Sequence, residues 1–409
     1  MAACAGAAEV STGETQNAIT AHDTTMRSVA TGAPRGEPIR IGGTLGLTGP
    51  FAEPSAGYHA AYQFWVANIN RSGGLLGRPV ELVIYDDVSA PDTSRSLYQR
   101  LLDQDDVDLL VAPYNTAIGE AVLPIAERNR MVLFNGGFAG VELFRRSDWM
   151  VGTLTSQEPD HTRGVFELVD ALPAAQRPQR IGIATARNPF TMAIRDGADG
   201  VGGVHDFARR RGIPVVVDEE YVPGSAGIGD IVARAQAGNV DLFFALALPS
   251  DGAVLARAAH SVGFAPDIYC ACGAQVVGLP SWTELGPAGD GIMSTAMAWH
   301  SDDYPMLDVL YDHAQWELRY PELSAELTSG YAIMQVLQAA VEGVGEIHQA
   351  ALRDYVTART IDTVVGPLRF DGHGIPAYSS IVVQDAGDHH EVVWPPERAT
   401  SRPSIRPAS

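Results

Sequence analysis

The sequence predicts an α/β protein of two lobes, each built on a doubly wound sheet with a parallel core. From Pro38 onward, short β-rich runs alternate with helical segments, as in βαβ units. The alternation restarts after residue 154, so two halves of similar size follow one another. The 409 residues are 46% hydrophobic and 19% charged, which suits a folded protein of two or three domains.

The first half alternates strands with helices. The helix over 60–70 is amphipathic, with Ala61, Trp65 and Ile69 on one face, and Gly73-Gly74 ends it. The same alternation predicts strands over 39–47, 80–85, 108–112 and 131–134, and helices over 92–102 and 118–128.

The second half repeats this order after a β-rich run over 149–154. A helix ends at Arg211-Gly212, where glycine supplies the C-cap. The other elements are strands over 180–185, 214–221, 241–247 and 267–272, and helices over 161–172, 228–237 and 252–262.

The end of the chain differs from both halves. Helices are predicted at about 305–319, 324–343 and 347–358, followed by strands over 364–370 and 379–384. Such a mixed tail after two similar halves implies that the chain crosses between the lobes more than once.

The charge balance excludes several classes of function. With 28 Lys+Arg against 49 Asp+Glu, the net charge of −21 repels phosphate backbones, so we expect no nucleic-acid partner. The sequence contains no lysine. Schiff-base catalysis, pyridoxal phosphate anchoring and a Walker-A phosphate site each need a lysine amine and are therefore excluded.

The N-terminus resembles the end of a bacterial lipobox, because small residues surround Cys4 in Ala2-Ala3-Cys4-Ala5. A polar, Ser/Thr/Gly-rich segment follows up to residue 37, as expected for a disordered tether. We expect a lipid on Cys4 to be the only membrane attachment. The alternative is a disordered tail with a chance cysteine, in a cytoplasmic protein if Met1 is the native start.

Catalytic and metal-binding patterns are poor. No HExxH and no GxSxG elbow is present, and no glycine-rich phosphate loop follows a strand, so no cofactor is predicted. Cys270 and Cys272 lack further ligands at zinc spacing, so we expect buried structural cysteines and no disulfide framework. His389-His390 is interpreted as a solvated surface pair. No catalytic residue is predicted.

Loops after the predicted strands carry side chains suited to holding a small molecule. Ligands of parallel sheets bind beyond the carboxyl ends of the strands, where hydroxyls and amides orient them and aromatic rings bury their apolar part. The alternative is that these are ordinary loop residues. The candidates are Ser55, Tyr114, Asn115, Thr116, Asn135, Phe138, Phe190, Ser250, Cys272 and Gln275.

Three runs resemble one known family at the right order and spacing. They are Leu47-Thr48-Gly49-Pro50 with the run ANINRSGGLLG over 67–77, then Tyr85-Asp86-Asp87, and finally DTVVGPLRFD over 362–371. These residues resemble the type I periplasmic solute-binding proteins of branched-chain amino acid ABC transporters, over residues 37–395. The resemblance implies two Rossmann-like lobes joined by three crossovers, a small organic ligand in the cleft, an ABC permease as partner, and a monomer.

The resemblance also implies a division of the chain. Lobe 1 comprises 38–156 and 298–377, and lobe 2 comprises 157–297 and 378–397. Residues 1–37 form the tether and 398–409 a disordered tail.

Some ligand positions of that family are matched and others are changed. The resemblance places Thr116 where a hydroxyl holds the ligand carboxylate, Gly137 where a carbonyl receives the ammonium, and Phe190 where an aromatic ring walls the pocket. A second threonine of the family is replaced by Ala139, and a tyrosine falls near Ala247. The acidic partner of the ammonium falls near Gly273 or Ala274. Glu326 could replace that partner, although we expect it at a surface position on a helix.

We therefore expect an extracytoplasmic solute-binding protein, not an enzyme. Its ligand is amino-acid-like, an amide or an aromatic acid, with one polar head and a sizeable apolar body, rather than free leucine or valine. Two alternatives remain: a ligand-sensing regulator with the same fold, and an enzyme derived from it.

Overall fold

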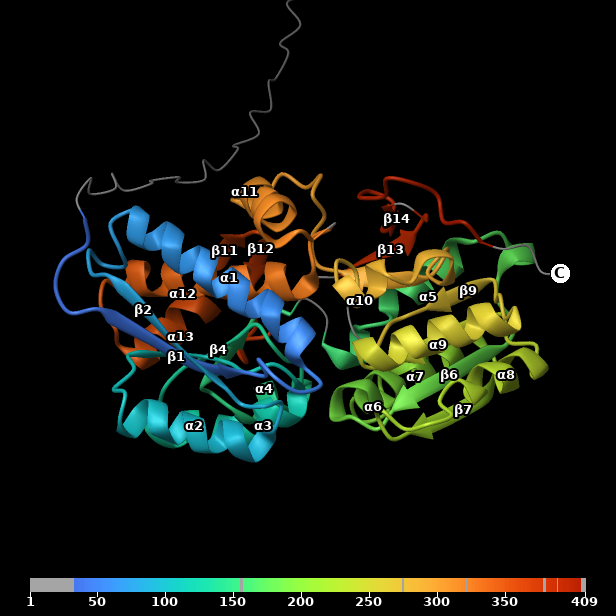
Figure 1. Ribbon diagram of the computed structural model, residues 1–409, viewed down its shortest axis with the longest axis horizontal. Helices are drawn as coiled ribbons and strands as arrows, with labels where there is room; N and C mark the ends of the chain where they lie inside the picture. Colours follow the sequence, from blue (N-terminus) through green and yellow to red (C-terminus); the bar gives the residue numbers. More distant parts are fainter. Residues whose placement is uncertain are drawn as a thin grey trace, which may run out of the picture.

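Two lobes lie side by side in the computed structural model of this chain (Figure 1). The structure describes residues 33–154, 157–273, 276–320, 322–377, 380–387 and 389–405. Cys4 and nearly all of the predicted tether lie outside these ranges, so the predicted lipid site is not described.

Lobe 1 contains a sheet of five strands in the order β2-β1-β3-β4-β5. All neighbouring pairs are parallel. The strands are short and apolar, as expected where helices cover both faces. Their bounds are β1 (Ile39–Leu45), β2 (Val80–Asp86), β3 (Leu109–Val111), β4 (Leu133–Asn135) and β5 (Met150–Gly152).

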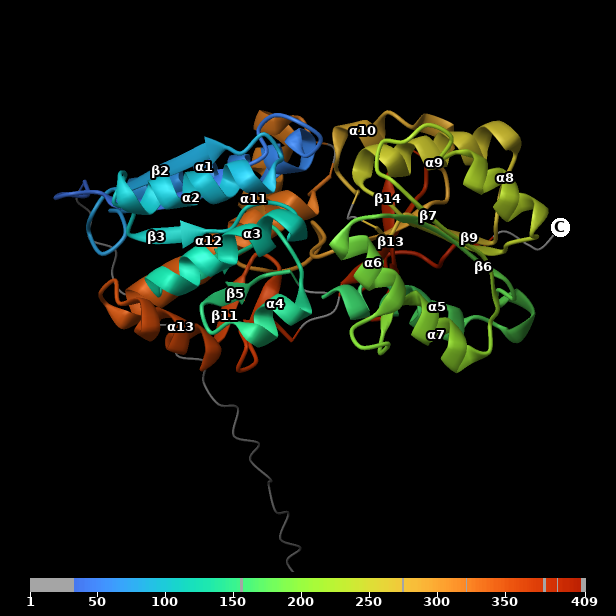
Figure 2. The same cartoon turned by 90° about the horizontal axis from the view of Figure 1, so that it is seen from below.

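Helices cover both faces of this sheet (Figures 1 and 2). On one face, Tyr62 and Trp65 of α1 and Leu337 of α12 pack in a core with β1. On the other, Tyr98 of α2 and Val122 of α3 pack on β3 and β4. The helices of lobe 1 are α1 (Ala52–Arg71), α2 (Pro91–Asp103), α3 (Thr116–Asn129), α4 (Val141–Arg146), α11 (Leu307–His313), α12 (Ala325–Val344) and α13 (Gln349–Thr357).

Lobe 2 contains a sheet of seven strands in the order β14-β13-β10-β9-β8-β6-β7. Its core is parallel, and the last two strands along the chain join one edge in antiparallel orientation. The bounds are β6 (Ile181–Ala186), β7 (Val215–Tyr221), β8 (Leu242–Leu246), β9 (Ile268–Cys270), β10 (Met293–Ala296), β13 (Ile381–Asp385) and β14 (His390–Trp394).

Two hydrophobic clusters, one for each face, fix the helices of lobe 2. Phe166 and Phe207 pack with Phe244 on one face, and Val232 and Leu255 pack with Phe243 on the other. The helices are α5 (Arg163–Ala171), α6 (Pro189–Asp196), α7 (Gly203–Arg211), α8 (Asp230–Ala237), α9 (Pro249–Val262) and α10 (Pro280–Thr283).

The chain passes between the lobes three times. It leaves lobe 1 after β5, returns after β10, and leaves again after the hairpin of β11 (Thr360–Thr363) and β12 (Gly366–Arg369). In Figure 1 the orange segments α11–α13 therefore lie with the blue lobe, and the red strands β13 and β14 lie with the green and yellow lobe. Two doubly wound sheets and repeated crossings agree with the predicted fold class.

Several predicted elements need correction. The helix expected over 60–70 begins earlier, at Ala52. The strand expected over 364–370 is confirmed over Gly366–Arg369 (β12), but Val364 and Val365 form the turn of a hairpin with β11, which was not predicted. The helix expected to end at Arg211 is two helices, separated by a segment with glycines at positive φ. Strands β10 and β14 were not predicted.

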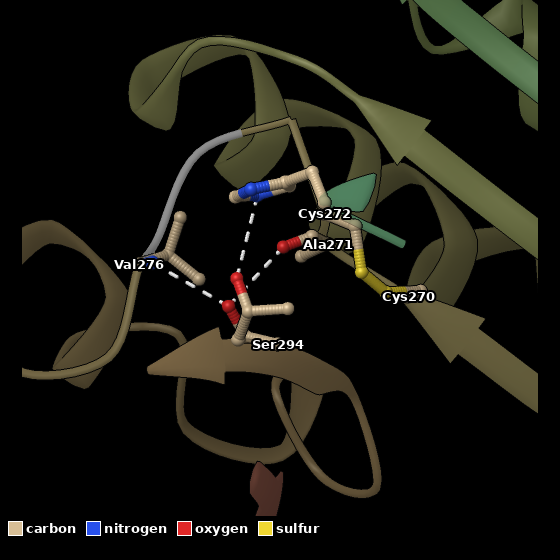
Figure 3. Close-up of a disulfide and its surroundings, with 7 residues drawn as sticks. Cys270, Ala271, Cys272, Val276 and Ser294 are labelled. Atoms are coloured by element: carbon tan, nitrogen blue, oxygen red, sulfur yellow. Dashed lines mark hydrogen bonds between the residues drawn. A yellow bond between two sulfur atoms is a disulfide. The ribbon is translucent and has the colours of Figure 1, made fainter. Parts of the chain in front are cut away.

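Cys270 and Cys272 are buried, as expected, but they are joined by a disulfide, which the sequence did not predict (Figure 3). Their Cα atoms lie 5.3 Å apart, within the usual range for a disulfide. Beside them, the Ser294 hydroxyl donates a hydrogen bond of 3.2 Å to the carbonyl of Ala271, which holds β9 next to β10.

Residues 398–405 differ from the expected disordered tail. The Ser404 backbone exchanges two hydrogen bonds with the Gln384 side chain, at 2.8 and 2.9 Å. The Thr400 hydroxyl accepts a hydrogen bond of 2.9 Å from the Val392 amide. This segment is therefore held against the edge of the lobe 2 sheet.

Candidate functional site

A cavity that is partly open to solvent lies between the lobes, beyond the carboxyl ends of the parallel strands. This is where open α/β sheets bind ligands. Lobe 1 and lobe 2 both contribute to its wall, which is mostly apolar and aromatic. The lining residues are Tyr58, Tyr114, Asn115, Thr116, Gly137, Phe138, Ala139, Leu154, His161, Phe190, Leu248, Gly273, Ala325 and Glu326.

Two loops of lobe 1 form one side of the cavity and are hydrogen-bonded to each other. The backbone amide of Asn115 donates to the Gly137 carbonyl at 3.1 Å, and the Thr116 hydroxyl donates to the Ala139 carbonyl at 3.0 Å. Asn115 has a φ of 81° and caps α3 by accepting from the Ala117 amide. A non-glycine residue at positive φ is strained, and such strain often occurs at binding sites.

Asn135, the last residue of β4, fixes the loop that follows this strand. Its side-chain oxygen accepts from the amides of Gly137 and Phe138 at 3.1 and 3.0 Å, and its side-chain nitrogen donates to the Phe138 carbonyl at 2.8 Å. The side chain is fully buried. Asn135, predicted as a ligand contact, instead positions the loop that carries Phe138.

Aromatic pairs stand on the two sides of the cavity. In lobe 1, the rings of Tyr58 and Tyr114 lie 5.7 Å apart. In lobe 2, His161 meets Phe190 edge-on at 5.4 Å. A ligand between the lobes would therefore contact aromatic rings from both sides.

Glu326 is the carboxyl group of the cavity wall. It is the second residue of α12, is 3% exposed, and has one side-chain oxygen, Oε2, without a hydrogen-bond partner. Burial raises the pKa of Glu326 to about 8, against hydrogen bonding from its own backbone and Ser324, which lowers it. The expected surface position was wrong, because α12 packs against α1 and buries its own first turn.

His161 also lines the cavity, from the lobe 2 side. Burial lowers the pKa of His161 to about 4, so the ring is neutral at neutral pH. Its Nε2 lies 3.4 Å from the Thr295 hydroxyl, while Nδ1 is buried without a hydrogen-bond partner.

Four helices begin at the cavity: α3 at Thr116, α6 next to Phe190, α9 after Leu248, and α12 at Ala325. Helix N-termini carry partial positive charge. No arginine is among the residues that line the cavity. The electrostatics of the wall are therefore set by helix dipoles, neutral polar groups and Glu326.

One contact joins the lobes beside the cavity. Glu53 of α1 accepts two hydrogen bonds of 2.7 Å from Ser281 of α10, one from its amide and one from its hydroxyl. Because α1 belongs to lobe 1 and α10 to lobe 2, this contact is one of those that join the two lobes; another is the hydrogen bond that the Val141 amide donates to Glu158.

Not every predicted residue lines the cavity. Ser55 is buried inside α1, and its hydroxyl has no hydrogen-bond partner. Ala247 packs in the core of lobe 2, although the adjacent Leu248 does line the cavity. Cys272 is in the disulfide, and Ser250 is exposed on α9. Gln275 and Ala274 lie outside the described residues.

Sequence reasoning missed Tyr58, Leu154, His161, Leu248 and Ala325. Tyr58 lies on a helix expected to start later, and His161 precedes α5 near the first crossing between lobes. Nothing local marks either residue as part of a cavity, since both reach it through tertiary packing.

The chain forms two lobes with parallel-core sheets, which are linked by three crossings and have a cavity between them. This arrangement defines a bilobed ligand-binding protein. The family model described as "Periplasmic binding protein" matches residues 38–388, so the chain belongs to this family. It is a solute-binding protein, and the family is non-enzymatic. Membership of this family implies an extracytoplasmic location.

Relatives and solved structures agree with this assignment. The Leu/Ile/Val-binding protein of Escherichia coli (strain K12) is 23% identical over 343 residues, covering 83% of this chain and 88% of that protein. A leucine binding protein from Thermotoga maritima has the same fold, with a TM-score of 0.75 and 17% sequence identity. The match covers 87% of this chain and 97% of that chain. A solute-binding protein from R. palustris, solved in complex with benzoate, has a TM-score of 0.74 and 16% sequence identity. The match covers 90% of this chain and 99% of that chain.

Within the described ranges, no helix is both long and apolar enough to cross a membrane. The same residues contain no cluster of three or more His, Cys, Asp or Glu side chains suited to a metal ion.

Proposed function

We propose that this protein captures a small organic solute between its lobes and delivers it, as a monomer, to an ABC permease. The ligand carries one polar head and a sizeable apolar or aromatic body. The observation that supports this proposal is the interlobe cavity, whose aromatic pairs come from both lobes and whose polar groups are few.

The ligand-binding residues that we propose are those predicted residues that line the cavity. Thr116 hydrogen-bonds the polar head, and the Gly137 carbonyl accepts from the ligand. Tyr114, Phe138 and Phe190 surround the apolar body. Asn115, Ala139, Gly273 and Glu326 complete the wall. Gln275 stays a prediction.

Closure of the lobes desolvates the ligand. A ligand that contacts both lobes binds the closed state more tightly than the open state and shifts the population toward it. The lobe boundaries that we propose for this motion are 38–156 with 298–377, and 157–297 with 378–397.

A thermal-shift screen of amino acids, amides and aromatic acids tests this function, since a bound ligand stabilises the native state. We expect a hit that also binds in calorimetry. Submicromolar binding of leucine, isoleucine or valine would contradict the proposed ligand class. A screen without any hit would contradict capture itself.

Thr116→Val removes the proposed hydroxyl contact and keeps the shape of the side chain. We expect the affinity for the screened ligand to fall by about 1–3 kcal/mol, because a buried polar head loses its partner. An unchanged Kd in calorimetry would rule out Thr116 as the head-group contact.

We also propose that Cys4 carries a lipid, which anchors the protein to the outer side of a membrane. The support is the Ala2-Ala3-Cys4 run with the polar segment after it. Two or more acyl chains are needed for a stable anchor. Mass spectrometry of the protein expressed from its natural reading frame should show the lipid adduct on Cys4, and an unmodified Met1 in the cytoplasm would contradict it.

A further inference from the structure

Glu326 is held in place by close packing between two helices of lobe 1. A Cβ atom on Gly57 of α1 would lie 2.8 Å from the Cβ of Glu326, so only glycine at residue 57 allows this approach. The carboxyl group is thereby set in the cavity wall with Oε2 unpaired. Burying a carboxyl oxygen without a partner costs stability, so the position of Oε2 is not explained by the needs of the fold.

Among the residues that the structure describes, no positively charged side chain perturbs Glu326 or lines the cavity with it. The titratable groups that affect it or line the same cavity are Glu53 and Tyr58 from α1, Tyr114 from the loop after β3, Tyr320 before α12, and His161 from lobe 2. The tyrosines and His161 are neutral at neutral pH, and Glu53 is occupied with Ser281. A cation for Glu326 must therefore come from outside the wall.

Aromatic rings next to Glu326 favour the same kind of partner. Tyr58 and Tyr114 line the cavity together with Glu326, and both hydroxyls are close enough to be affected by its charge. The faces of aromatic rings attract cations, and this attraction is stronger where water is excluded. A carboxylate with two tyrosine rings in a largely apolar cavity between the lobes suits an organic ammonium group.

We infer that Glu326 binds a protonated amine of the ligand, so that the transported solute is an organic amine with an apolar or aromatic body. This inference rests on the proposed function and specifies the polar head.

Binding of an amine is then linked to release of a proton. In the empty cavity the carboxyl group is mostly protonated at pH 7, because burial raises its pKa to about 8. An incoming ammonium group forms an ion pair with the ionised carboxylate, and the carboxyl proton leaves to solvent. The affinity should therefore rise about tenfold from pH 6 to pH 7 and level off above pH 8.

Ligands with other head groups should show a different dependence of affinity on pH. A carboxylate ligand would bind only the protonated form of Glu326, so its affinity would fall above pH 8. A neutral amide would exchange no proton with Glu326. The sign of the proton linkage therefore identifies the charge of the head group.

Three probes with the same ring test the inference: phenethylamine, phenylacetamide and phenylacetate. We expect phenethylamine to bind most tightly in calorimetry and to release about one proton per ligand at pH 7, measured in two buffers of different ionisation enthalpy. Glu326→Gln should weaken phenethylamine at least about tenfold and remove its pH dependence. Glu322→Gln is the matched control, since Glu322 is buried nearby but does not line the cavity.

Each other outcome overturns the inference. If phenylacetate or phenylacetamide binds more tightly than phenethylamine, the amine assignment is wrong, but the proposed function still stands. The same holds if Glu326→Gln binds phenethylamine as tightly as the natural protein does. Binding of none of the three probes, with no hit in the wider screen, would overturn both. Proton release is measured on the unmodified protein, so the test holds even if Glu326→Gln fails to fold.

Discussion

Individual residues at the site divide into those visible from local sequence and those visible only in the fold. Thr116 and Phe138 follow strand ends, and the carboxyl ends of parallel strands meet at one edge, so both could be placed at a cavity in advance. Glu326 and His161 could not. Their burial depends on helices that meet from distant parts of the chain, and a buried carboxyl group is rare enough that a surface position was the natural expectation.

Glu326→Gln should change how stability depends on pH. The pKa of Glu326 is raised from 4.5 to about 8 in the folded protein, so between these values the unfolded chain binds fewer protons and the free energy of unfolding falls as pH rises. Glutamine does not titrate. The variant should therefore gain about 3 kcal/mol relative to the natural protein between pH 5 and pH 8.

Urea unfolding of both proteins at the two pH values measures this difference. Because every other titrating group is common to both proteins, their contributions cancel. A difference that stays constant with pH would show that Glu326 titrates normally.

At the scale of elements, alternation of apolar runs placed most strands and helices within a few residues. The failures have physical causes. Strand β10 (Met293–Ala296) carries Ser294 and Thr295, so neither hydrophobicity nor a period of two marks it, and its pairing with β9 and β13 is what makes it a strand. The break between α6 and α7 lies at glycines, which tolerate both helical and turn conformations.

The contact between α1 and α12 sets the wall of the cavity and can be tested at Gly330. A Cβ there would lie 2.9 Å from the Cβ of Ala61 and 3.1 Å from a ring carbon of Tyr58. Alanine gains about 1 kcal/mol in helix propensity over glycine, but overpacking a helix interface costs about 1–3 kcal/mol.

We expect Gly330→Ala to be destabilised by about 1 kcal/mol in urea unfolding and to bind ligand more weakly, since Tyr58 lines the cavity. A more stable variant with unchanged affinity would mean that the helices separate freely at this point.

For the whole molecule, the repeat of one α/β pattern predicted two lobes, and three crossings agree with the implied connection. The sequence could not indicate how the lobes meet. The contact of Glu53 with Ser281 spans the lobes, and neither residue is part of a recognisable motif.

Ser281→Ala should weaken ligand binding without touching the cavity. A hydrogen bond to a charged group contributes about 1.5–3 kcal/mol when buried, and this one is partly buried, so we expect a loss of about tenfold in affinity as the closed state becomes less populated. Thr283→Val is the control, because its hydroxyl bonds only within α10. If the natural protein and both variants have equal Kd values in calorimetry, the Glu53–Ser281 contact does not stabilise the closed state.

The three crossings also determine when each lobe can be completed during synthesis. Lobe 1 needs α12, near residue 340, to cover the face of a sheet whose first strand begins at Ile39, and lobe 2 needs β13 and β14, which end at Trp394. Contacts between such distant residues form late and slowly. A nascent chain that has passed the first 300 residues therefore has two unfinished cores: lobe 1 waits for α12 and the segments that follow it, and lobe 2 waits for β13 and β14.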